Sequence, residues 1–284
     1  MEIIRIPRVM QDTAGRHRLA SKSIGFVPTM GALHEGHMSL VRLARAENDV
    51  AVASIFVNPL QFGPSEDFSV YPRDFEGDAE KLREAGLDIL FLPDASLMYP
   101  KGFSTSVVVE GLSEKLCGAY RPGHFRGVAT VVTKLLNSTS PGRAYFGQKD
   151  FQQTVIIRRA VKDLDMPVEI VVCPTAREDD GLALSSRNRY LSEAERKAAT
   201  VIYRCLSEAS GAIRSGIIEV RRLRDLMKGI LRSEPRVSVI QYASVYDPET
   251  LDEIDQADRE CLLAVAVIIG QTRLIDNMCA GPGR

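Results

Sequence analysis

The sequence lacks the features that mark several classes of protein. No apolar run approaches the ~20 residues that cross a bilayer, and residues 1–18 show no signal-peptide pattern. The formal net charge is −1, so no overall field attracts nucleic acid or an anionic membrane surface. We therefore expect neither a nucleic acid nor a membrane among the partners of this chain.

Cysteine is scarce and scattered. None of the five cysteines belongs to a C-x-x-C pair, and they stand at Cys117, Cys173, Cys205, Cys261 and Cys279. This is typical of reduced thiols that pack in the interior of a cytoplasmic protein. The rest of the composition is that of a globular protein, with 45% hydrophobic and 26% charged residues. The length of 284 residues suits one large or two ordinary domains.

The most informative stretch runs from Ile24 to Leu43. Ile24–Thr29 is apolar and favours a buried strand, Gly31 interrupts the pattern, and apolar residues at helical spacing follow. A helix that starts just after a parallel strand directs backbone N–H groups and the positive end of its dipole toward that point. Two histidines at this turn, His34 and His37, indicate a phosphate site.

Three other interpretations of residues 34–37 compete with a phosphate site. The histidines of a zinc helix lie at i and i+4, whereas these lie at i and i+3 with Gly36 between them. A P-loop continues with Lys and then Ser or Thr after its last glycine, where this chain has His37. A purely structural role for both histidines stays open, although two of the four histidines in the chain flank one turn glycine.

The turn also matches the His-x-Gly-His arrangement of the nucleotidyltransferase superfamily. Attack on the α-phosphorus of ATP builds negative charge on its equatorial oxygens and on the departing pyrophosphate. Imidazole N–H groups directed at these oxygens stabilise that charge without a covalent step. Gly36 lets the backbone pass close to a nucleotide.

A second apolar run at 50–57 predicts a buried parallel strand that ends in a loop. Ligands of open α/β sheets bind outside the carboxyl ends of the strands, so Asn58 and Gln61 in this loop are placed for a substrate. Taken without its context, Asn58 is better explained as stabilising a turn, with no ligand role. The next expected elements are a helix capped by Asp74 and ending near residue 85, a strand at 88–92 and a short strand at 105–109.

Two further segments carry polar groups. Residues 117–128 precede a helix at 128–136, and Arg121, His124 and Arg126 there suit an anion or a solvated loop equally well. A short strand at 144–147 enters Gln148-Lys149-Asp150, where Lys149 is suited to neutralising phosphate charge.

Asp150 and Gln153 carry a second, structural interpretation. An acidic residue followed three positions later by Gln fits a helix N-cap with Gln at N3. A helix at 154–164 and a strand at 168–172 follow. The two roles of Gln153, capping and ligand binding, stay open at this point.

The composition changes at residues 174–176, and the polar segment 177–188 predicts a domain boundary, which divides the chain into 1–176 and 177–284. Ser192 and Glu195 form a capping-box pattern that opens a helix to about residue 213. The remaining elements predict a smaller α+β unit, with a helix at 219–231, strands at 237–246, 261–269 and 272–275, and a disordered tail at 279–284.

Six segments, taken together and in this order, resemble the pantoate–β-alanine ligase family, also called pantothenate synthetases. They are PTMGALHEGH at 28–37, NPLQFGPSEDFSVYPRD at 58–74, CGAYRPGHFRGV at 117–128, YFGQKDFQQ at 145–153, REDDGLALSSRN at 177–188 and TRLIDN at 272–277.

The resemblance implies a Rossmann-like parallel α/β domain that binds ATP and pantoate, and a smaller α+β lid domain. It further implies a cytoplasmic homodimer that serves coenzyme A biosynthesis. The catalytic groups would be His34, His37, Lys149 and Arg187. Pantoate would contact Gln61, Gln153, Met30 and Asn58, and β-alanine would contact Gln61. ATP would contact Met30, Gly31, Ala32, Leu33, His34, Glu35, Gly36, His37, Gly147, Gln148, Lys149, Asp150, Ala176, Leu184, Ser185, Ser186 and Arg187.

The chain departs from the family pattern at four positions. We expect Met where Leu184 stands, Glu where Gln148 stands, Tyr where Phe151 stands and Val where Ala176 stands. Leu in place of Met preserves volume. ATP would bind with Mg²⁺, but Gln148 removes a possible carboxylate, so the sequence assigns no protein ligand to the metal.

The reaction implied by the resemblance has two steps, adenylation of pantoate by ATP and capture of the pantoyl adenylate by the amine of β-alanine. Two rivals stay open. One is a nucleotidyltransferase that stops at adenylyl transfer, which would share the histidine turn but not the Gln61 and Gln153 segments. The other is a non-catalytic nucleotide-binding module, against which the intact His34, His37 and Lys149 argue.

Overall fold

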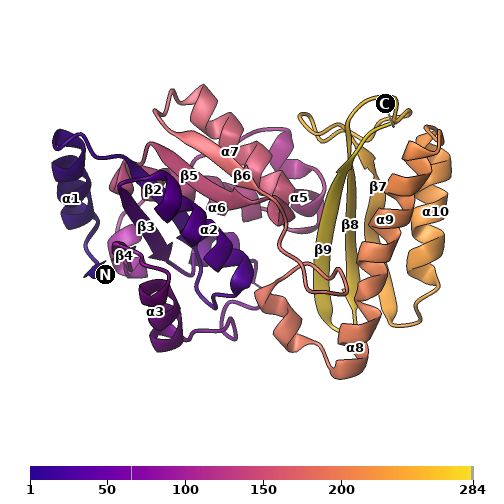
Figure 1. Ribbon diagram of the computed structural model, residues 1–284, viewed down its shortest axis with the longest axis horizontal. Coiled ribbons are helices and arrows are strands. Elements are labelled where there is room, and N and C mark those ends of the chain that lie inside the picture. Colours follow the sequence, from indigo (N-terminus) through magenta and orange to yellow (C-terminus); the bar gives the residue numbers. More distant parts are fainter. Residues whose placement is uncertain (65, 283–284) are drawn as a thin grey trace. The chain divides into compact units, whose positions relative to one another are not determined.

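A computed structural model describes residues 1–64 and 66–282 (Figure 1). The chain divides into two compact units. The first comprises Met1–Glu114, Arg121–Gly147 and Ile156–Pro174, and the second comprises Lys115–Tyr120, Gln148–Val155 and the chain from Thr175 onward. The last change of unit, after Pro174, lies close to the boundary expected after residue 176. The assignment of separate functions to 1–176 and 177–284 stays a proposal.

The first unit is built on a six-stranded sheet with the order β1-β4-β3-β2-β5-β6. Every pairing in it is parallel. From β2 the chain proceeds outward on one side and then returns to the other side of β2, which places a topological switch point between β2 and β5. The strands are β1 (Glu2–Ile4), β2 (Ile24–Thr29), β3 (Val50–Ile55), β4 (Ile89–Phe91), β5 (Arg143–Gly147) and β6 (Glu169–Cys173).

Helices cover this sheet because its strands are apolar on both faces. Val41 of α2 and Leu82 of α3 share one buried cluster with Val27, Ala51 and Leu90 of the strands, so these two helices cover the same face. Helix α1 packs against α6. The helices are α1 (Pro7–Leu19), α2 (Glu35–Glu47), α3 (Phe75–Glu84), α4 (Ala95–Met98), α6 (His124–Thr139) and α7 (Phe151–Asp163), with 3₁₀ turns η1 (Pro59–Gln61) and η2 (Leu112–Glu114).

The second unit pairs an antiparallel sheet with helices (Figure 1, yellow and orange). Leu263 and Val265 of the central strand are fully buried with Leu206 of α9 and Leu223 of α10. The strands are β7 (Val237–Tyr246), β8 (Cys261–Ile269) and β9 (Thr272–Ala280), in that order. The helices are α5 (Cys117–Tyr120), α8 (Glu193–Ala198), α9 (Thr200–Arg214) and α10 (Val220–Arg232), with 3₁₀ turns η3 (Gln148–Asp150) and η4 (Ser186–Tyr190).

Two capping predictions are confirmed. The Asp74 side chain accepts from the backbone N–H of Gly77 at 3.0 Å and caps α3. Ser192 and Glu195 form the expected capping box at the start of α8. Both depend on contacts within one helical turn, which is why the sequence could predict them.

Three element predictions are wrong. Residues 105–109 form no strand, because the backbone N–H of Val107 donates to the Thr130 hydroxyl at 3.0 Å and not to a neighbouring strand. The single helix expected from 192 is two helices, α8 and α9. Residues Cys279 and Ala280, expected in a disordered tail, pair with Leu262 and Cys261 at the end of β9. The end of that predicted tail, 283–284, lies outside the described residues.

Helix α6 approaches the η1 turn so closely that only glycine fits at the contact. A Cβ at Gly127 would lie 2.2 Å from the Leu60 carbonyl oxygen and 2.7 Å from the Gln61 Cα. Both are backbone atoms, so relief would require the turn to move. The absence of a side chain at Gly127 therefore sets the position of η1.

Gly127→Ala should lower the free energy of unfolding by about 1–3 kcal/mol, the usual cost of overpacking. The matched control is Gly211→Ala in α9, where a Cβ would meet nothing within 4 Å. This control should be neutral or slightly stabilising, because Ala favours helix more than Gly does. Denaturant unfolding of both variants measures the difference, and equal stabilities would contradict the close approach.

Candidate functional site

The turn between β2 and α2 has a backbone that requires glycine. Gly31 has φ +81° and Ala32 has φ +52°, both in the left-handed region. A Cβ at Gly31 would lie 3.1 Å from both Asp78 Oδ2 and the Ile55 side chain. His34 is then extended, at φ −128°, and serves as the N-cap residue of α2.

Two residues of α3 hold this turn from the side. Asp78, which is 1% exposed, accepts from the backbone N–H groups of Ala32 at 2.7 Å and Leu33 at 2.8 Å. Lys81 donates to the Leu33 carbonyl at 2.9 Å. Burial raises the pKa of Asp78, although the two N–H bonds act in the opposite direction. Sequence reasoning missed both residues, because Asp78 and Lys81 resemble the ordinary charges of a solvated helix.

The two histidines of the turn lie together. Their ring centroids are 4.1 Å apart with 45° between the planes. The His34 backbone N–H donates to His37 Nδ1 at 3.4 Å, so in the neutral imidazole of His37 the proton resides on Nε2. A half-buried N–H donor at the positive end of the α2 dipole suits an anion.

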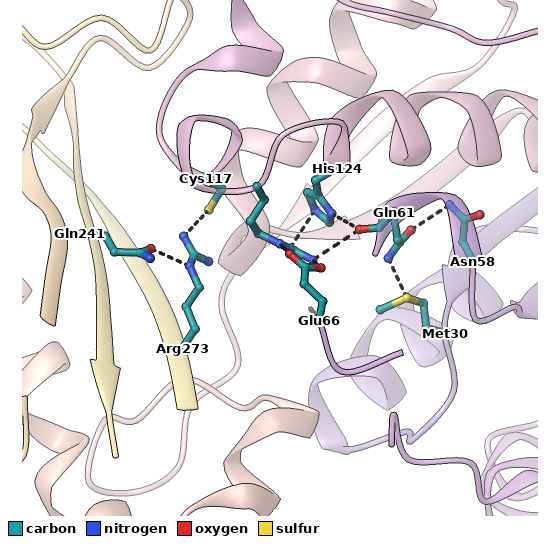
Figure 2. Close-up of polar contacts among 9 residues, drawn as sticks. Met30, Asn58, Gln61, Glu66, Cys117, His124, Gln241 and Arg273 are labelled. Atoms are coloured by element: carbon teal, nitrogen blue, oxygen red, sulfur yellow. Dashed lines mark hydrogen bonds and ion pairs between the residues drawn. The ribbon is translucent and has the colours of Figure 1, made fainter. Parts of the chain in front are cut away.

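Gln61 lies beside this turn in the first unit (Figure 2). It is 8% exposed, and its Nε2 donates to the Met30 sulfur at 2.7 Å. Asn58 donates to Gln61 Oε1 at 3.2 Å and so orients the amide. Every polar position of Asn58 is occupied, since it also donates to Gly127 O and accepts from Leu60 N and Tyr99 OH.

An ion pair and the first residue of α6 support the Gln61 turn. Arg121 binds both carboxylate oxygens of Glu66, at 2.7 and 2.6 Å. His124 Nδ1 lies 2.7 Å from Gln61 O and must donate to it, since a carbonyl only accepts. Burial opposes ionisation of Glu66, but the Arg121 hydrogen bond and charge prevail, so the pKa of Glu66 is lowered. Arg121 thus binds an anionic group of the chain itself, and both Arg121 and His124 are half-buried, whereas Arg126 is exposed.

In the second unit, the segment Lys115–Tyr120 is tied to the antiparallel sheet. Cys117 Sγ lies 3.1 Å from Tyr242 OH and accepts from Arg273 at 3.4 Å. Arg273 also donates to Gln241 at 2.7 Å (Figure 2). The Cys117 backbone N–H donates to Gln152 Oε1 at 2.9 Å.

The neighbouring glutamines 152 and 153 have different surroundings. Gln152 is 5% exposed, and its amide also donates to the Lys115 carbonyl at 2.7 Å. The side chain of Gln153 is half-buried, stands at the third position of α7 and makes no hydrogen bond within residues 1–64 and 66–282. The structure therefore gives no support to the capping interpretation of Gln153.

The predicted second-unit residues form two local groups. Lys149 lies in η3, with its Nζ 3.8 Å from Asp150 and the Gln148 and Lys149 carbonyls bound by Asn277. Ala176 accepts from the Leu184 N–H at 2.9 Å. Ser185 caps η4 by accepting from the Arg187 N–H at 3.3 Å. Arg177 binds Asp276 with two hydrogen bonds, at 2.6 and 3.0 Å.

The predicted site residues thus gather in each unit separately. The first unit brings His34 and His37 together, and also Met30, Asn58 and Gln61. The second brings Gln148, Lys149 and Asp150 against Asn277. Among the residues that the structure describes, no three or more His, Cys, Asp or Glu side chains are arranged to hold a metal ion. Nor is any described helix long and apolar enough to span a bilayer.

Comparisons with known proteins agree over the length of the chain. A family model described as Pantoate-beta-alanine ligase matches residues 2–279. A pantothenate synthetase of Thermodesulfovibrio yellowstonii is 58% identical over 278 residues, covering 98% of this chain and 99% of the relative. The crystal structure of pantothenate synthetase from Thermus thermophilus has a TM-score of 0.94 at 47% identity, covering 99% of this chain and 100% of that one.

One similar structure carries ligands. It is pantoate-β-alanine ligase from Francisella tularensis complexed with beta-gamma ATP and β-alanine. It has a TM-score of 0.80 at 35% identity, covering 98% of this chain and 97% of that one.

The half-buried Glu66–Arg121 pair predicts a pH-dependent stability. Glu66→Gln keeps the shape but removes the charge, and should lower the free energy of unfolding by about 1–3 kcal/mol at pH 7. The folded-state pKa of Glu66 is lowered from 4.5. Its stabilisation is therefore present above about pH 4.5 and is lost as pH falls through the folded-state pKa.

The native chain and the Glu66→Gln variant should therefore differ less in their free energy of unfolding as the pH falls. Denaturant unfolding from pH 7 to pH 3 measures this difference. Glu193→Gln is the control, since its pair with Lys197 is 85% and 75% exposed and contributes little. A Glu66→Gln difference that is constant with pH would contradict the ion-pair assignment.

Proposed function

The chain belongs to the pantoate–β-alanine ligase family, and from this premise we propose how it joins pantoate to β-alanine at the expense of ATP. A carboxylate oxygen of pantoate attacks the α-phosphorus of ATP, the bond to the β-phosphate oxygen breaks, and pyrophosphate leaves. The β-alanine amine then attacks the acyl carbon of the pantoyl adenylate. Its nitrogen loses a proton and AMP leaves with the electron pair of the broken C–O bond.

The observation that carries this mechanism is the pair of imidazoles at the start of α2. No side chain need become covalently attached, so catalysis rests on positioning and charge stabilisation. We assign His34 and His37 to the ATP phosphates. The Ala32 and Leu33 N–H groups already donate to Asp78. We therefore assign the charge stabilisation in Met30–His37 to the imidazoles and the α2 N-terminus, and contact with the nucleotide to the remaining residues of this segment.

Gln61 is the proposed ligand of pantoate and, in the second step, of β-alanine. Its Nε2 has a thioether sulfur as partner, which is a weak acceptor. A substrate carboxylate or hydroxyl would replace that contact with a stronger one. Asn58 has no polar position left, so its contribution to the pantoate site is to orient Gln61. Gln153 supplies a second amide.

The second unit would complete the ATP site. We assign Lys149 to the phosphates, with Gln148 and Asp150 around it and with Gly147 contributed by the first unit. Ala176 and Leu184–Arg187 would close over the nucleotide as part of a lid, with Arg187 adding positive charge. Mg²⁺ is proposed to arrive with the ATP phosphates as part of the substrate. A homodimer and a cytoplasmic location remain proposals that rest on the resemblance alone.

One assay tests the proposed reaction. ATP and pantoate are supplied with and without β-alanine, and pyrophosphate, AMP and pantothenate are measured. Pantothenate and AMP should form only when β-alanine is present, in equal amounts with pyrophosphate. Pyrophosphate release with no pantothenate would instead identify an enzyme that stops at adenylyl transfer. No turnover at all would identify a nucleotide-binding module.

His37→Ala should slow pyrophosphate release by about 10²-fold or more, the scale of losing one preorganised donor. The fold should survive, because the side chain is half-buried at the turn. His17→Ala in α1 is the control and should keep full activity. Single-turnover kinetics measure the rate and circular dichroism measures the fold. A folded His37→Ala protein with native kinetics would remove His37 from the phosphates.

Gln153→Glu should leave thermal stability near normal and strongly weaken the response to pantoate. The carboxylate suits the positive end of α7, but it places a negative charge beside an anionic substrate and removes the N–H donors. The matched variant is Gln152→Glu, which should instead destabilise the fold by losing the bond to Lys115 O. Unchanged pantoate kinetics in Gln153→Glu would exclude the amide from the pantoate site.

A further inference from the structure

Asn277 of β9 binds the turn that carries Lys149. It is 4% exposed, and its side-chain Nδ2 donates to the Gln148 carbonyl at 3.0 Å and to the Lys149 carbonyl at 2.9 Å. One amide group thus binds two consecutive carbonyls, and all of these residues belong to the second unit.

Binding two consecutive carbonyls fixes the backbone of the residue between them. The Gln148 carbonyl sets the plane of the peptide before Lys149, and the Lys149 carbonyl sets the plane of the peptide after it. The φ and ψ angles of Lys149 relate these two planes, because each peptide is rigid. With both planes held, the direction of the Lys149 Cα–Cβ bond is determined.

Asn277 is itself held in place. Its backbone N–H donates to Asp276 Oδ1 at 2.8 Å, and Asp276, 4% exposed, is bound at both oxygens by Arg177. The amide cannot be reversed, since Oδ1 would then face two carbonyl oxygens. In the observed orientation Oδ1 is buried with no hydrogen-bond partner among the described residues.

The two hydrogen bonds of the Asn277 amide, and not its unpaired oxygen, indicate what this residue does.

We propose that Asn277 is a positioning residue, which directs the Lys149 ammonium toward the ATP phosphates by fixing the two peptides that flank it. The inference rests on the proposed function, which assigns Lys149 to those phosphates. It accounts for the presence of TRLIDN among the family-like segments, since Asp276 and Asn277 act through the Lys149 turn.

A double-mutant cycle tests the proposal, because residues that act through one another are not additive. The variants are Asn277→Ala, Lys149→Ala and the double variant, with Asn277→Asp as an isosteric second form whose carboxylate would repel the two carbonyls. Asn277→Ala should lower kcat at least about tenfold, the scale of a misplaced catalytic group. The KM for β-alanine should not change, and the double variant should be no slower than Lys149→Ala.

A binding measurement and a control variant allow the double-mutant cycle to be interpreted. The dissociation constant of a non-hydrolysable ATP analogue is measured for all variants, so a Lys149→Ala protein too slow to assay still gives the coupling. Ser244→Ala, which removes another buried hydrogen bond of the same sheet, reports what destabilisation alone does to kcat and should leave it unchanged.

The outcomes separate the inference from its premise. Full activity in Lys149→Ala would overturn both the phosphate role of Lys149 and the inference. A slow Lys149→Ala beside a native Asn277→Ala and Asn277→Asp would overturn the inference alone. Losses that multiply in the double variant, or an equal loss in Ser244→Ala, would also overturn it, because Asn277 would then act on the fold and not through Lys149.

Discussion

The arrangement of the proposed phosphate site in the first unit depends on the turn that follows β2. The strand ends at the switch point of the sheet, and the backbone must turn within residues 30–34 to start α2. That turn needs positive φ at Gly31 and Ala32, and its N–H groups need an acceptor in an interior position. The buried carboxylate of Asp78 supplies the acceptor. The placement of both imidazoles at the helix start follows from this one contact between α3 and the turn.

The same kind of support recurs around Gln61 and Lys149, two other proposed ligand groups. Asn58 orients the Gln61 amide, Arg121 and Glu66 hold the loop that carries it, and Asn277 holds the Lys149 turn. Each support is buried or half-buried and is charged or carries an amide, so it fixes a direction that apolar packing would leave less defined. The family-like segments thus contain supporting residues as well as those proposed to touch a substrate.

Much of the fold and the proposed chemical groups could be predicted from the sequence. Strands with continuous apolar runs, the Asp74 cap and the Ser192 capping box depend on neighbours within a few positions, so pattern and propensity suffice. Asp78, Lys81 and Asn277 could not be recognised, because their partners lie 46, 48 and 128 positions away.

The adjacent glutamines show the same limit most clearly. The local pattern singles out Gln153 as the capping residue, yet it is Gln152 that forms hydrogen bonds, to Cys117 and Lys115, while Gln153 has no partner among the described residues. The distinction is made by a segment more than thirty positions earlier in the chain, at separations of 35 and 37.

The interleaving of the two units along the chain limits how its gene can be divided and recombined. The chain changes unit after Glu114, Tyr120, Gly147, Val155 and Pro174, so no single cut yields both units whole. A gene fragment ending at residue 174 would carry Lys115–Tyr120 and Gln148–Val155 away from the sheet that binds them. Neither whole unit can therefore be exchanged as a single continuous segment of the gene.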